Sequence, residues 1–309
     1  MNVFYLLLCV LFGGACAFVL CAAAGDSGKV MAAPDMKLYK KAFLPGNLAA
    51  PMAIAVCSLC AVALGSHFGI LHSGKVGQLQ LCLGLVFCCL LALFGLWDDT
   101  LRIFGGSHIG LPFGLRQAVL ALSSAVYTFL QSKIGGTVLV FPTRNFNLGV
   151  WYTPVCTLLC MAVLLGVQAL ILKPTCCHVL VLFAAAGVLP LFGKLENHAL
   201  SVLAAATAGV VSTLFWYSYP VSRVYMGSCT NLFLGGIVCC LCVQSLPVIS
   251  AVCALPLMAV GLLAALLLLF PRAAGAKRLS NLFNQTSIDI CMAAGFLCAA
   301  AAGIFTIYL

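Results

Sequence analysis

The residues best suited to chemistry in this chain are two adjacent carboxylates. Of 309 residues only six are acidic, and two of these, Asp98 and Asp99, directly follow the apolar run 90–97. Neighbouring carboxylates repel each other and are costly beside hydrocarbon, so they usually serve a cation, a proton or a basic partner. A Mg²⁺ ion that bridges them to a ligand phosphate would fit. The competing interpretation is a solvated pair at a helix end, with its charge offset by Arg102 and Arg116.

The composition shows which elements must position this pair. Hydrophobic residues make up 64% of the chain and charged residues 7%, with a mean hydropathy of +1.19. A water-soluble domain carries about a quarter charged residues, so this composition excludes a soluble fold. No aromatic and basic pattern suggests nucleic acid, and no phosphate-binding glycine loop is present. The chain is therefore predicted to be a single integral membrane domain, residues 1–309.

Repeated apolar runs of about 20 residues match the thickness of a bilayer core. We expect an all-α, polytopic protein with ten transmembrane helices, the first being a true helix and not a signal peptide. The predicted spans are 4–23, 48–71, 79–96, 117–130, 151–172, 179–192, 199–216, 232–248, 251–270 and 288–308.

The basic residues of the short loops set the orientation, because cytoplasmic loops are enriched in Lys and Arg. With the amino terminus outside, the inner face receives eleven of the 15: Lys29, Lys37, Lys40, Lys41, Arg102, Arg116, Lys173, Arg223, Arg272, Lys277 and Arg278. The outer face receives the other four: Lys75, Lys133, Arg144 and Lys194. Both termini are thus placed on the outer face of a cell membrane, expected to be the bacterial inner membrane, with cytoplasmic functional loops. This basic face suits anionic lipid headgroups or phosphate-bearing ligands.

The 19 cysteines lie mostly within the apolar spans. A free cysteine behaves as a small hydrophobe, so packing is their expected role. Cys57 and Cys60 form a C-x-x-C, and Cys176, Cys177 and His178 cluster at an expected helix end. Binding of a soft metal ion is the alternative.

The segment 95–102, which contains Trp-Asp-Asp, and the segment 219–236, which contains Tyr-Pro and Met-Gly-Ser, resemble motifs of the polyprenyl-phosphate N-acetylhexosamine-1-phosphate transferases, the family of phospho-N-acetylmuramoyl-pentapeptide transferase. Gly-Leu-Trp-Asp-Asp-Thr-Leu-Arg at 95–102 is similar to the family's aspartate-pair motif. Tyr-Pro-Val-Ser-Arg-Val-Tyr-Met-Gly-Ser-Cys-Thr-Asn-Leu-Phe-Leu-Gly-Gly at 219–236 is similar to Tyr-Pro-Ala-x-x-x-Phe-Met-Gly-Asp-x-Gly-Ser-Leu-x-Leu-Gly. Order, spacing, inner-face placement and the count of ten helices also agree, so the resemblance covers nearly the whole chain.

The resemblance implies transfer of a sugar-1-phosphate from a UDP-sugar to a polyprenyl phosphate, such as undecaprenyl phosphate, in cell-envelope glycan synthesis. It implies Mg²⁺ held by Asp98 and Asp99, which would be the catalytic and metal-binding residues. Basic side chains would bind substrate, with these candidates: Lys40, Lys41, Arg102, Arg223, Lys277 and Arg278.

The chain departs from the family's pattern at several catalytic positions. The family's second acidic segment would align with Gln-Ala-Leu-Ile-Leu-Lys-Pro-Thr-Cys-Cys-His at 168–178, which has no Asp or Asn. Ser228 stands where the family has the Asp of Met-Gly-Asp, and the last inner loop, Lys-Arg-Leu-Ser-Asn-Leu-Phe at 277–283, has no histidine. Each such loss typically costs a factor of hundreds to thousands in rate.

The leading hypothesis is therefore a catalytically degenerate relative, a pseudoenzyme that binds lipid phosphate or a partner membrane enzyme, or forms a homo-oligomer. Two alternatives stay open. One is a divergent, active, Mg²⁺-dependent transferase that uses Asp98, Asp99 and Arg102. The other is a transporter or metal handler that uses the thiols or the aspartate pair.

Overall fold

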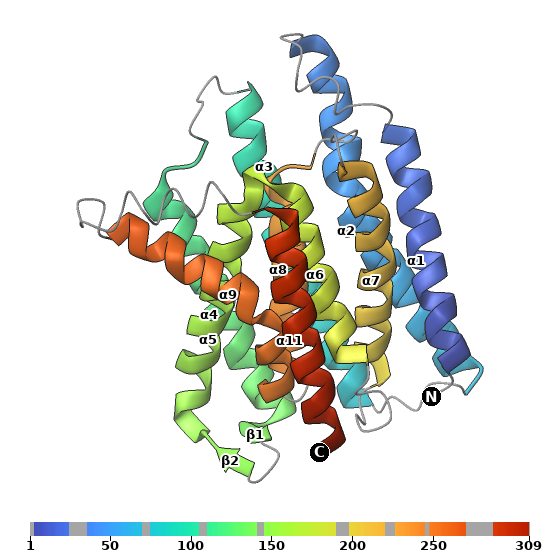
Figure 1. Cartoon of the computed structure of the whole chain (residues 1–309), viewed down its shortest axis with the longest axis vertical. Coiled ribbons are helices and arrows are strands. Elements are labelled where there is room, and N and C mark those ends of the chain that lie inside the picture. Colours follow the sequence, from blue (N-terminus) through green and yellow to red (C-terminus); the bar gives the residue numbers. More distant parts are fainter. Residues whose placement is uncertain are drawn as a thin grey trace.

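The chain folds almost entirely into helices, packed side by side in one bundle (Figure 1). The computed structural model describes residues 3–24, 36–69, 75–104, 110–140, 145–189, 198–219, 226–244, 247–269 and 287–308. The α-helices within these residues are α1 Val3–Ala24, α2 Met36–His67, α3 Lys75–Phe104, α4 Phe113–Gly135, α5 Tyr152–Ala169, α6 Pro174–Val188, α7 His198–Ser218, α8 Ser228–Gln244, α9 Pro247–Leu269 and α11 Ile288–Tyr308.

Six segments of the described residues are long and apolar enough to cross a membrane. They are Val3–Ala23, Asn47–His67, Lys75–Arg102, Phe113–Gly135, Gly149–Ala169 and His198–Ser218. Four shorter apolar segments accompany them: Pro174–Val188, Ser228–Gln244, Ala251–Leu266 and Ile288–Ile304. The predicted all-α membrane fold is confirmed at this level, while the count of ten transmembrane helices stays a prediction.

Helices α7 and α8 form the centre of the bundle. Every residue of α8 from Ser228 to Val243 is buried, and so is nearly all of the first two-thirds of α7. Helix α1 packs along α7 and α2, and its outer side is a row of exposed apolar side chains that includes Phe4, Leu11 and Phe18. A bundle whose exposed surface is apolar is suited to lipid, not water.

Every predicted span overlaps one of these helices, but the helix ends differ from the prediction. Helix α2 begins at Met36, twelve residues before the predicted start at 48, and α3 continues to Phe104, beyond the predicted end at 96. The prediction followed apolar runs, whereas a helix continues past the hydrocarbon as long as its backbone hydrogen bonds continue. The aspartate pair is therefore part of a helix and not of a loop.

A short antiparallel hairpin between α4 and α5 was not predicted. Strand β1, Val138–Val140, pairs with β2, Asn145–Asn147, in the register Val138 with Asn147. A 3₁₀ turn, Gly149–Trp151, joins the hairpin to α5. The hairpin lies at the same end of the bundle as the start of α1 and the end of α11 (Figure 1).

Candidate functional site

Asp98 is completely buried near the end of α3, where it holds two guanidinium groups. Arg102 lies one helical turn further along α3, and its Nη2 is 2.8 Å from Asp98 Oδ2. Arg116 Nη1 reaches the same oxygen from α4 at 3.7 Å. The Leu111 backbone N–H donates to Oδ1 at 2.8 Å, and the Ser228 hydroxyl of α8 donates to Oδ2 at 3.2 Å. Both oxygens of this carboxylate are thus occupied by protein donors.

Asp99 is also buried, and the donors that reach it from the described residues are neutral. The Asn47 side chain of α2 and the Cys229 backbone N–H of α8 each donate to Asp99 Oδ2 at 3.2 Å. Asn47 is itself fixed, because its Oδ1 accepts the Gly227 N–H at 2.7 Å and its backbone carbonyl accepts the Thr230 hydroxyl at 3.0 Å. We call Asn47, Asp98, Asp99, Arg102, Arg116 and Ser228 the aspartate junction. It connects α2, α3, α4 and α8.

Glycines allow the close approaches that this junction needs. A Cβ at Gly95 would lie 2.7 Å from the Cys229 backbone, so only glycine lets α3 come this near to the first turn of α8. Gly110 has φ +69° in the turn before α4, a left-handed conformation that glycine adopts without strain. That turn brings the Leu111 N–H to Asp98.

The structure brings some of the predicted site residues together. Asp98, Asp99 and Arg102 meet in the junction, and both carboxylates are buried, so the solvated helix-end interpretation is wrong, although Arg102 and Arg116 do offset Asp98. Lys40 and Lys41 belong to α2, but their side chains lie outside the described residues. The other basic candidates lie wholly outside the described residues: Arg223, Lys277 and Arg278.

Four polar residues of this region were missed or undervalued as site residues. Arg116 was counted only as a basic charge, and Asn47, Gln168 and Asn231 were given no role at the site. Asn47 and Asn231 are fully buried polar residues in apolar segments, and such residues are expensive in a membrane and commonly functional. The cost of burying a side-chain amide in an apolar segment was the sequence signal that could have identified Asn47 and Asn231 as site residues.

The geometry does not favour a resident Mg²⁺ at the aspartate pair. Mg²⁺ needs near-octahedral oxygen ligands and usually keeps several waters. Here Asp98 already faces two cations, and Asp99 is surrounded by the packed residues of α2 and α8. Among the described residues no group of three or more His, Cys, Asp or Glu is placed to hold a metal ion.

The members of the two candidate thiol clusters are buried in packing positions, with the exception of Cys60. Cys57 is buried and directs its thiol to the Cys9 carbonyl at 3.5 Å, while Cys60 is exposed on the outer side of α2. His178 is buried beside Ser218, with its Nδ1 3.3 Å from the hydroxyl.

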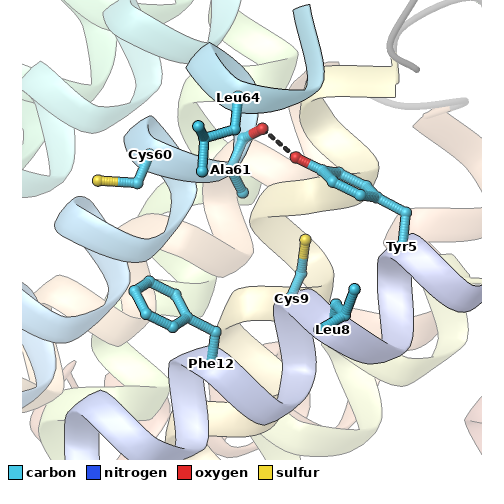
Figure 2. Close-up of a pocket in the computed structure, with 7 residues that line it drawn as sticks. All are labelled: Tyr5, Leu8, Cys9, Phe12, Cys60, Ala61 and Leu64. Carbon is cyan, nitrogen blue, oxygen red and sulfur yellow. Dashed lines mark hydrogen bonds between the residues drawn. The ribbon is translucent and has the colours of Figure 1, made fainter. Parts of the chain in front are cut away.

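Two wholly apolar pockets lie between α1 and α2. One is shown in Figure 2, where the Tyr5 hydroxyl donates to the Ala61 carbonyl above Cys9 and Phe12. The other is lined by residues that include Val19, Met52 and Val56. Met52 and Val56 of α2 line this pocket beside α1, whereas Asn47 on the same helix contacts α3 and the start of α8. Hydrocarbon would fit these pockets, but they do not open to the junction.

No family model matches the chain, and no curated protein matches it with significance. The resemblance to sugar-1-phosphate transferases thus stays a prediction that rests on the two motifs.

Proposed function

We propose that this chain is a non-catalytic membrane protein of cell-envelope glycan synthesis. It has the helical scaffold expected of a polyprenyl-phosphate sugar-1-phosphate transferase and binds a lipid phosphate at its inner face without transferring a sugar to it. Such a protein would present or sequester the lipid for a partner membrane enzyme.

The observation that carries the proposal is the occupancy of both carboxylates. Two guanidinium groups, a hydroxyl and a backbone N–H satisfy both oxygens of Asp98, and an amide and a backbone N–H donate to Oδ2 of Asp99. A divalent cation would have to displace Arg102 and Arg116 from Asp98 against their positive charge. A metal-dependent transferase needs these oxygens free, so the pair is better suited to hold helices together than to hold Mg²⁺.

The substitutions in the sequence support the same conclusion. Ser228 stands where the resembled family has an aspartate, and here it donates a hydrogen bond to Asp98. An aspartate at this position would instead add a third carboxylate beside the pair and would disfavour the closed arrangement. The serine therefore favours a junction that is closed without a metal.

A transfer assay tests the proposal. Protein purified in detergent is incubated with Mg²⁺, undecaprenyl phosphate and radiolabelled UDP-GlcNAc or UDP-MurNAc-pentapeptide, with an active family transferase as the positive control. We expect no lipid-linked product and no exchange of labelled UMP. Product that disappears in the Asp98→Asn variant would overturn the proposal and establish the divergent active transferase.

A further inference from the structure

Unpaired polar groups gather in a narrow cleft on one side of Asp98. The cleft lies among α3, α4, α5 and α8, and its lining consists of Asp98, Arg116, Gln168, Ile171, Ser228, Asn231 and Leu232. Its free space holds no more than about one water molecule. One oxygen atom of a ligand therefore fits between these side chains as they stand.

Asn231 is the residue that most needs an explanation. It is 1% exposed, and neither its Nδ2 nor its Oδ1 has a hydrogen-bond partner among the described residues. Buried side-chain amides are nearly always paired, because desolvation of an unpaired group is costly. Asn231 lies one turn after Ser228 on α8 and lines the cleft. It therefore offers a donor and an acceptor to something that enters there.

The other free groups of the cleft are mostly donors. Gln117 donates to Gln168 Oε1 at 2.9 Å, which leaves the Gln168 Nε2 group unpaired among the described residues. Arg116 Nε is also unpaired there. With Asn231 Nδ2 the lining thus has three free donors, one of them on a cation, and a single free acceptor, Asn231 Oδ1.

This arrangement matches the oxygens of a phosphate monoester. The one phosphate oxygen that enters the cleft accepts from Arg116, Gln168 and Asn231 when it is anionic, and as the hydroxyl of the monoanionic form it donates to Asn231 Oδ1. The side chains of Arg102 and Arg116 are 29% and 20% exposed, so the rest of the phosphate can reach them from outside the cleft. The two guanidinium groups offset Asp98, which would otherwise repel the anion.

We propose that Arg116, Gln168 and Asn231 form a metal-independent binding site for a phosphate monoester. The inference rests on the proposed function, because it names the residues and the ligand chemistry of the same inner-face site. This site differs from the one that the family resemblance implies, in which Asp98, Asp99 and Mg²⁺ hold the phosphate.

Binding of farnesyl phosphate, a short polyprenyl monophosphate, tests the site. The Kd is measured in detergent with EDTA for the parent chain and for the Asn231→Leu, Arg116→Met and Ser124→Ala variants. Asn231→Leu and Arg116→Met are expected to raise the Kd at least about tenfold, since each removes a hydrogen bond to a charged group. Ser124 is the matched control, because its buried hydroxyl is also unpaired among the described residues and lies on α4, yet it does not line the cleft.

Stability separates a binding role from a structural one. Asn231→Leu replaces an unpaired amide with an apolar group of similar size, so its melting temperature without ligand should equal or exceed that of the parent. Equal Kd values for Asn231→Leu and the parent would overturn the inference. So would binding that appears only when Mg²⁺ replaces EDTA, or equal binding of farnesol, which lacks the phosphate.

Inorganic phosphate serves as a second probe and identifies the source of the ligand. Competition by inorganic phosphate that depends on Asn231 supports a site for the free anion. If farnesyl phosphate binds in a way that depends on Asn231 and inorganic phosphate does not compete, the result supports a site for a lipid headgroup. Sugar transfer in the assay above would reject the proposed function, whereas these binding results decide the phosphate site by themselves.

Discussion

Adjacent aspartates have different partners because successive residues on a helix point about 100° apart. Asp98 faces α4 and two guanidinium groups, whereas Asp99 faces α2 and the backbone of α8. Asp98 therefore neutralises charge, and Asp99 accepts hydrogen bonds from neutral groups. Replacement of the two carboxylates by amides should have unequal effects.

Asp98→Asn is expected to destabilise the protein by about 3 kcal/mol, because it leaves two largely buried guanidinium groups without their anion. Asp99→Asn should cost no more than about 1 kcal/mol, since its donors are neutral. The free energy of unfolding of each variant is measured by titration with a denaturing detergent in mixed micelles. The double variant Asp98→Asn, Arg116→Gln should recover part of the loss, and equal losses for the two single variants would contradict these roles.

At the scale of elements, glycine and alanine let helix pairs approach closely. A Cβ at Gly209 of α7 would overlap the Val10 carbonyl of α1, and one at Gly261 of α9 would overlap the Ala162 carbonyl of α5. Lipid provides no hydrophobic driving force between helices, so such close packing stabilises their association. These seams keep the outer helices against the core that carries the junction.

Gly209→Ala should therefore destabilise the bundle by about 1–3 kcal/mol, because the added methyl group meets backbone that has no room to move. Gly303→Ala on α11 is the matched control, since a Cβ there meets no heavy atom within 4 Å. Alanine also favours a helix over glycine, so the control should be neutral or stabilising. Melting temperatures in detergent give the comparison, and a similar fall in both variants would refute the packing explanation.

The helices themselves were largely predictable, and their ends were not. Apolar runs identify segments that lie in hydrocarbon, so every predicted span overlaps a helix. They carry no information on where a helix stops beyond the hydrocarbon, which is why the third predicted span ends at 96 whereas α3 continues to Phe104. The hairpin β1–β2 was missed because its strands have only three residues each, too few for a period-two pattern.

At the scale of the whole molecule, the junction is assembled from three consecutive helices, α2, α3 and α4, and the remote helix α8. Asn47 and Asp99 are 52 positions apart, and Ser228 and Asp98 are 130 apart. The spacing of the motif identified the aspartates and Arg102, because Asp98 and Arg102 are four residues apart on one helix. Asn47, Gln168 and Asn231 could not be paired with them from one sequence, because no local spacing relates helices that meet only in the folded bundle.

The orientation of the bundle decides which compartment this site faces. The start of α1, the end of α11 and the hairpin lie at one end of the bundle, and the end of α3 lies at the other (Figure 1). The predicted topology assigns eleven of the 15 basic residues to the inner face, Arg102 near the end of α3 among them, so the positive-inside rule predicts that this end of the bundle is cytoplasmic.

Reporter fusions test that orientation. Alkaline phosphatase, which folds only after export, should be active when fused after Lys133 or after Leu309 and inactive after Lys173. A green fluorescent protein of the kind that folds only in the cytoplasm should show the opposite pattern at the same three positions. If the patterns are reversed, the aspartate junction faces outward, away from cytoplasmic phosphates. The phosphate site would then have to take its ligand from the outer leaflet.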